Sequence, residues 1–262
     1  MEKRLIARGL LAGVVGSVLA FIFARLCAEP VIARAIAFED GRTDAEEAHG
    51  VHEHGVELFT RGVQSSPGLG FGVLLFGVAM GALFSVLFCV VYARSKDVEA
   101  RLLSVQLAAA SFVGVYLVPF LKYPPNPPAV GQSDTIKERT GWYLLMVLVS
   151  VVLAGGAVWL ARRLEARFGA WNAWLLAAGT YIVVLAAVTA LLPTVDETPA
   201  PLRDASGVII YPGFPADVLY EFRLLSLATQ LILWVSIGVV FSTLASRLLG
   251  ERADRTSSIA AA

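Results

Sequence analysis

The sequence predicts an all-α, polytopic membrane protein, because apolar residues dominate it and gather into uncharged runs of membrane-spanning length. Hydrophobic residues make up 57% of the 262 positions and charged residues only 16%. The mean hydropathy of +0.70 is that of a membrane protein rather than a soluble domain. A helix needs about 20 residues to cross about 30 Å of hydrocarbon. We therefore expect about six spans, with five as the alternative, joined by structured Pro-rich and His-rich outer loops.

The expected spans cover, in chain order, residues 9–24, 69–92, 102–121, 140–161, 171–192 and 224–246. The first is short, but Arg8 and Arg25 at its two ends can snorkel and so lengthen the effective span. This segment also resembles a secretory signal peptide with a weak cleavage site at 26–28, so retention and cleavage both stay open. We expect residues 1–250 to form a single transmembrane domain and residues 251–262 a disordered cytoplasmic tail.

Basic residues indicate the orientation of the chain. Lys and Arg are concentrated in the N-terminus, in the short segments 92–101 and 162–167, and in the C-terminal tail. Short loops rich in Lys and Arg stay in the cytoplasm. Both termini are therefore predicted to be cytoplasmic, and the long acidic loop at 29–68 is predicted to be periplasmic.

The periplasmic loop contains every histidine of the chain, at three positions within six residues of one another. The predicted metal ligands are His49, His52, His54, Glu46, Glu47, Glu53 and Glu57. Imidazole and carboxylate together suit Co, Ni, Zn or Cu(II), and the ligand set does not by itself select cobalt. The alternative interpretation is a solvated acidic loop that happens to hold the imidazoles.

Four other polar residues are predicted to receive or admit a cation near the mouth of the helix bundle. Asp217 and Glu221 are four residues apart at the start of the last helix and share one face. Capping of that helix N-terminus is the structural alternative. Glu29 follows Arg25 by four residues, where an ion pair is the simpler explanation. Asn126 lies in a stiff, proline-rich segment that ends the third span.

Small residues in the spans are expected to allow close helix packing. The four glycines concerned are Gly77, Gly81, Gly155 and Gly156. In membranes, helices approach most closely where small side chains face each other. Packing alone is enough to explain these residues.

The chain resembles the CbtA family of predicted cobalt transporter subunits over most of its length. The resemblance rests on Lys-Tyr-Pro-Pro-Asn-Pro-Pro at 122–128, Glu-Arg-Thr at 138–140, Phe-Pro-Ala-Asp-Val-Leu-Tyr-Glu-Phe-Arg at 214–223, and Ala-Glu-Pro at 28–30. It implies uptake of Co²⁺ across the bacterial inner membrane for cobalamin synthesis, with Ni²⁺ or Zn²⁺ as alternatives. It also implies a small single-helix partner subunit, CbtB. Family members are usually described as having five spans.

These observations predict a subunit for divalent metal uptake. The alternative is a membrane metal receptor or accessory subunit that binds or senses the ion without forming the path. An enzyme is not expected, because histidine confined to one loop leaves no catalytic constellation to assemble. The sequence contains no phosphate-binding loop of the Gly-x-x-x-x-Gly-Lys type. We expect no permanently bound cofactor and no nucleic acid, and the expected partners are membrane lipid, the CbtB-like subunit and a second copy of the chain.

Overall fold

A computed structural model describes residues 2–49, 68–95, 98–131 and 135–250. The chain is an all-α, multi-pass membrane protein, and its described residues contain five helices long and apolar enough to cross a membrane. It divides into two compact units, one made of Met1–Phe112 with Pro201–Ala262 and the other of Val113–Ala200. We describe each unit by itself.

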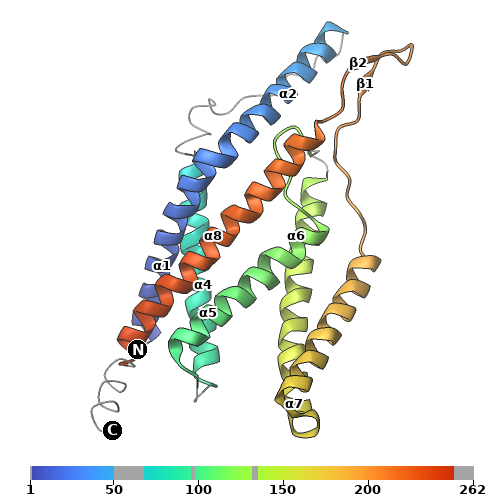
Figure 1. Ribbon diagram of the computed structural model, residues 1–262. Coiled ribbons are helices and arrows are strands. Elements are labelled where there is room, and N and C mark those ends of the chain that lie inside the picture. Colours follow the sequence, from blue (N-terminus) through green and yellow to red (C-terminus); the bar gives the residue numbers. More distant parts are fainter. Residues whose placement is uncertain (1, 50–67, 96–97, 132–134, 251–262) are drawn as a thin grey trace, which may run out of the picture. The chain divides into compact units, whose positions relative to one another are not determined.

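The first unit begins with one continuous helical run of 47 residues. It consists of α1 (Glu2–Phe23), the π-helical turn η1 (Ala24–Ala28) and α2 (Glu29–Ala48), which lie end to end in Figure 1. Pro30 has no N–H and would clash with the preceding turn of an α-helix. The wider π turn accommodates it, with the Glu29 N–H bonded to Ala24 O. Residues 29–48 are therefore helical, where the sequence analysis expected the start of an outer loop.

Helix α4 (Leu69–Tyr92) packs directly on α1 through glycines. A Cβ added to Gly81 would lie 2.9 Å from Gly13 Cα, and one added to Gly77 would collide with Ser17. The expectation of close approach is thus confirmed for Gly77 and Gly81. A Cβ on Gly155 or Gly156 would meet nothing within 4 Å in the described part of the chain.

Two further helices belong to the first unit. Helices α5 (Ala100–Ser111) and α8 (Ala216–Leu248) pack on each other, and α8 also packs along α1. Phe241 of α8 meets the rings of Phe84 and Phe88 at centroid distances of 5.2 and 5.0 Å. All three rings are buried. Apolar packing of these aromatic rings therefore fixes the core of this unit.

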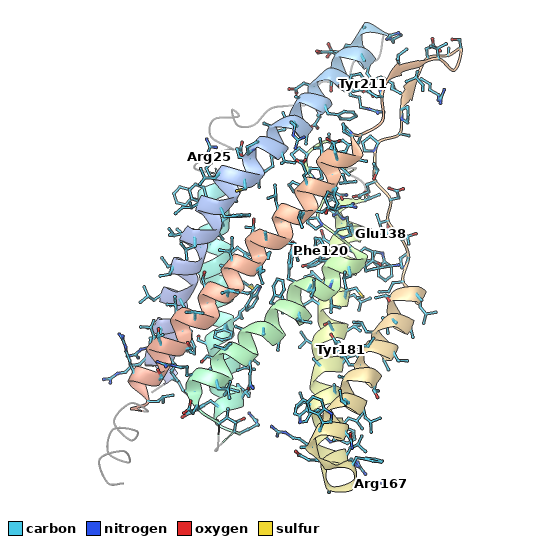
Figure 2. The ribbon with its side chains drawn as sticks, in the orientation of Figure 1. Arg25, Phe120, Glu138, Arg167, Tyr181 and Tyr211 are labelled. Atoms are coloured by element: carbon cyan, nitrogen blue, oxygen red, sulfur yellow. The ribbon has the colours of Figure 1, made fainter. Side chains whose placement is uncertain are left out.

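The second unit is built on a helical hairpin. After the π-helical turn η3 (Phe112–Leu117) and the short helix α6 (Val118–Lys122), helix α7 spans Ile136–Leu191. Its two arms meet at Gly169, whose φ of 75° and ψ of 160° are not helical. The arms contain the expected span 140–161 and the expected span 171–192 as far as Leu191, so the six apolar runs lie in helices apart from Leu192. Ser150 and Tyr181 join the arms by a 2.9 Å hydrogen bond, and Figure 2 shows Tyr181 on the second arm.

A short β-hairpin in the first unit packs beside α2. Strands β1 (Leu202–Arg203) and β2 (Ile209–Tyr211) are antiparallel, and the sequence analysis expected no strands. The Tyr211 hydroxyl donates to Phe38 O at 3.2 Å, and the two rings are 5.2 Å apart. Figure 2 shows Tyr211 beside α2. The hairpin is therefore held at the end of α2 that carries the first predicted metal ligands.

Candidate functional site

Of the three histidines predicted to bind metal, His49 lies within the described residues. It is the C-cap residue of α2. Its ring Nδ1 lies 2.8 Å from Ala45 O. Because a carbonyl oxygen only accepts, Nδ1 carries the proton in the neutral ring and Nε2 keeps the lone pair. Metal-binding histidines are commonly oriented in this way, by a hydrogen bond from the other nitrogen. Nε2 is thus the atom that His49 can offer to a ligand.

The other members of the predicted ligand set are only partly described. His52, His54, Glu53 and Glu57 lie outside the described residues. Within the described ranges, no group of three or more His, Cys, Asp or Glu is placed to hold a metal ion. The three-histidine site therefore stays a prediction.

His49 and Glu46 line an open pocket of about 500 Å³ between the end of α2 and the β1–β2 hairpin. The hairpin side is formed by Leu202, Arg203, Asp204, Ala205, Ser206 and Ile210. Glu46 Oε1 also accepts from Arg42 Nε at 3.0 Å, within the same helix. Glu47 is exposed on α2 and does not line this pocket.

Asp204 is the acidic residue on the hairpin side of the pocket, and it was not predicted from the sequence. Its Oδ1 accepts from Ser206 N at 2.9 Å, Ser206 Oγ at 2.6 Å and Val208 N at 2.9 Å. These bonds stabilise the carboxylate, so they lower the pKa of Asp204, with the Ser206 hydroxyl as the largest cause. The run Asp-Ala-Ser-Gly at 204–207 is a turn pattern, with the acidic residue first and glycine last. That pattern could have indicated the turn, although not its place beside His49.

Asp217 and Glu221 both lie beside the guanidinium group of Arg34. Arg34 of α2 forms an ion pair with Glu221 and lies 3.6 Å from Asp217, measured from Nη1 to Oδ2. Arg34 was not predicted as a partner, because nothing in its local sequence indicates a carboxylate 187 residues away. Glu29 lies in the first turn of α2. The arrangement around Arg34 is that of a partly exposed ion-pair cluster.

Asn126 is part of a partly buried hydrogen-bonded cluster in the second unit, around the buried Glu197. Its Nδ2 donates to Glu197 Oε2 at 3.0 Å, and Arg139 Nη1 donates to the same oxygen at 3.1 Å. The Thr135 hydroxyl donates to the other carboxylate oxygen. Arg139 Nη2 also donates to Pro124 O at 2.5 Å. The cluster holds the proline-rich segment against the start of α7, and its central residue, Glu197, was not predicted.

Comparison with known proteins supports one family. The family described as "Probable cobalt transporter subunit (CbtA)" matches residues 2–246. That range includes the pocket beside His49, the Arg34 ion pairs and the Glu197 cluster. No curated protein and no solved structure matches the chain.

Proposed function

The chain belongs to the CbtA family of probable cobalt transporter subunits, and from this we propose that it takes up a divalent transition metal, foremost Co²⁺ for cobalamin synthesis. The observation that carries the proposal is the extent of the family match, which reaches from residue 2 to residue 246 and so covers every described helix up to the last two residues of α8. Partner subunits follow from the role of the family as a transporter subunit. A small single-helix subunit of the CbtB kind is the partner we propose.

Capture of the ion is the first step of the proposed mechanism. Imidazoles of His49, His52 and His54 bind the ion together with neighbouring carboxylates. The end of α2 supports this step, because its last turn contains Glu46 and Glu47 and no basic residue. The C-terminal end of a helix dipole also attracts cations. Protonated imidazole has no lone pair to offer, so acidification weakens capture.

The proposed membrane orientation puts this end of α2 in the periplasm. The positions of Lys and Arg favour cytoplasmic termini in the bacterial inner membrane. A membrane potential of 100 mV, negative inside, then contributes about 4.6 kcal/mol to the inward movement of a divalent cation. Uptake therefore has a driving force that does not require nucleotide hydrolysis by this chain.

Passage through the described helices needs ligands or water from elsewhere. Among the described residues of the first unit, the buried polar residues are serines, for example Ser17, Ser85 and Ser104. Each hydroxyl donates to a carbonyl of its own helix. Such groups are poor replacements for the hydration shell of a dication. This observation favours a second candidate function, in which the chain is a receptor that delivers the ion to a partner forming the path.

Flux into proteoliposomes separates the two functions. Purified protein is reconstituted with and without the single-helix partner, a negative-inside potential is imposed, and internal Co²⁺ is measured. Uptake by the chain alone, lost when the three histidines are changed to alanine at limiting Co²⁺, is the expected result. Co²⁺ binding without flux in either preparation would exclude transport by this chain and support the receptor function. If the protein showed no Co²⁺ binding and no Co²⁺ flux, both functions would be rejected.

A further inference from the structure

We infer that the β1–β2 hairpin supplies the second half of the capture site, with Asp204 Oδ2 and His49 Nε2 binding one partly hydrated divalent transition-metal ion across the pocket between them. The inference rests on the proposed function, because it takes the end of α2 to be where the ion is first bound. It adds a ligand from a segment more than 150 residues away in sequence. It also gives the hairpin a role beyond connecting α7 to α8.

Aromatic contacts hold the hairpin in the position that this site requires. Phe38 of α2 lies against Tyr211 and, at a centroid distance of 5.0 Å, against Phe214. A Cβ on Gly41 would lie 2.5 Å from the Tyr211 hydroxyl, so the absence of a side chain at Gly41 allows this approach. Phe38 and Phe214 are both buried. The two walls of the pocket, α2 and the hairpin, are therefore held together by the packing of Phe38 on Tyr211 and Phe214.

The α2 wall offers a nitrogen in a setting that attracts cations. His49 Nδ1 donates a hydrogen bond to Ala45 O, which leaves Nε2 with the lone pair that can bind a metal ion. Backbone carbonyls end the helix here, and the last turn carries two acidic residues and no basic one. Glu46 lines the same pocket.

The hairpin wall offers a carboxylate that its own turn holds in place. The Asp204 side chain accepts at Oδ1 from Ser206 N, Ser206 Oγ and Val208 N. Oδ2 takes part in none of these bonds. The lowered pKa of Asp204 agrees with a carboxylate that stays ionised in this turn. A fixed anion therefore faces the same pocket as the imidazole.

The size and charge of the pocket fit a hydrated ion held loosely. About 500 Å³ leaves room for water ligands around an ion that the protein holds through two atoms. Ions of this class accept mixed nitrogen and oxygen ligands. Arg203 also lines the pocket, with its Nη1 donating to Gly207 O at 2.7 Å. Its positive charge reduces the affinity, which suits an ion that must be released to the next step.

Titration of the full-length protein with Co²⁺ tests the site, with calorimetry for Kd and visible absorption for the ligand set. Asp204→Asn keeps an acceptor for the turn and removes the charge. We expect Asp204→Asn and His49→Ala each to weaken Co²⁺ binding about tenfold or more and to shift the absorption spectrum. The double variant should lose less than the product of the two single losses, because both side chains act on one ion. Asp44→Asn is the matched control on exposed α2 surface and should stay within about twofold.

The outcomes separate this inference from the proposed function. Weakened binding in His49→Ala with unchanged binding in Asp204→Asn would overturn the role of the hairpin and leave capture by the histidines in place. If the fold losses of Co²⁺ affinity multiplied in the double variant, the two side chains would act independently, and the proposal that they bind one shared ion would be overturned. Failure of the parent protein to bind Co²⁺ would reject the capture step itself. Unchanged circular dichroism of each variant shows that a loss of binding is not a loss of fold.

Discussion

Arg139 of α7 donates from Nη1 to Oε2 of Glu197 at 3.1 Å, and the two residues are 58 positions apart in sequence. The Glu197 side chain is 2% exposed and that of Arg139 is 22% exposed. A buried charge is tolerated only when a partner and hydrogen bonds compensate for its lost hydration. Asn126 and Thr135 supply the remaining donors. This pair therefore locks the proline-rich segment of the second unit to the start of α7.

Replacing the central carboxylate should destabilise the second unit. In Glu197→Gln one oxygen becomes an NH₂ group that faces donors, and the Arg139 charge loses its partner. We expect a loss of about 3 kcal/mol, because breaking a buried pair leaves an uncompensated charge. Thermal unfolding in detergent measures it. Glu138→Gln is the control, since Glu138 is exposed and its amide variant can still accept from Trp142 Nε1. Equal melting temperatures for the two variants would contradict the role of Glu197 in holding the proline-rich segment to α7.

The helices were predictable from sequence because the cost of burying charge in a bilayer leaves long uncharged runs. All six runs lie in helices apart from Leu192. The continuation of α2 from Glu29 to Ala48 was not predicted, because acidic residues and Pro30 are typical of a loop as well as of a helix start. A proline in the first turn is compatible with the helix once a π turn precedes it.

The candidate sites were predictable only in part. Local spacing placed Asp217 and Glu221 on one face, but Arg34 reaches them from another helix. The clustering of histidines singled out His49, whereas Asp204 comes to the same pocket through tertiary packing of Tyr211 on α2. Such long-range pairs leave no periodic signal in a single sequence, so residue chemistry alone could not assign them.

The crossing of α1 and α4 should not tolerate a side chain at its glycines. Gly81→Leu would place a Cβ 2.9 Å from Gly13 Cα and force the two backbones apart. Membrane helices that pack through small residues lose most of their contact when this happens. We expect a loss of about 3 kcal/mol or more, measured as reduced folded yield and a lower melting temperature.

The matched control is Gly155→Leu on the first arm of α7. Its added Cβ would meet nothing within 4 Å in the described part of the chain, so a change of less than about 0.5 kcal/mol is expected. Equal damage from both substitutions would show that close approach of α1 and α4 is not the cause.

The Arg34 cluster should contribute little to stability. The side chains of Arg34, Asp217 and Glu221 are 46%, 68% and 45% exposed. Exposed ion pairs are screened by water and salt and are typically worth less than about 1 kcal/mol. Arg34→Met should therefore lower the free energy of unfolding by less than that amount, and the difference should shrink at 1 M salt. A loss above about 2 kcal/mol that salt does not change would show that the cluster is buried in the membrane-embedded protein.

Protonation of Asp204 should loosen the turn of the β1–β2 hairpin. Hydrogen bonds from Ser206 and Val208 lower the pKa of this carboxyl below its ordinary 3.8, so folding and ionisation favour each other. The stabilisation is therefore fully present above the unfolded pKa and is lost as the pH falls through the lower, folded pKa. The amide resonance of Val208 reports this directly, because its N–H donates to Asp204 Oδ1.

A titration of that resonance from pH 6 downward separates the carboxyl from other acidic groups. In the parent protein the Val208 amide signal should stay constant through the ordinary range of an aspartate and move only at lower pH. Asp204→Asn has no proton to gain, so its Val208 signal should be flat over the same range. A parent midpoint at or above 3.8 would show that the turn does not stabilise the carboxylate.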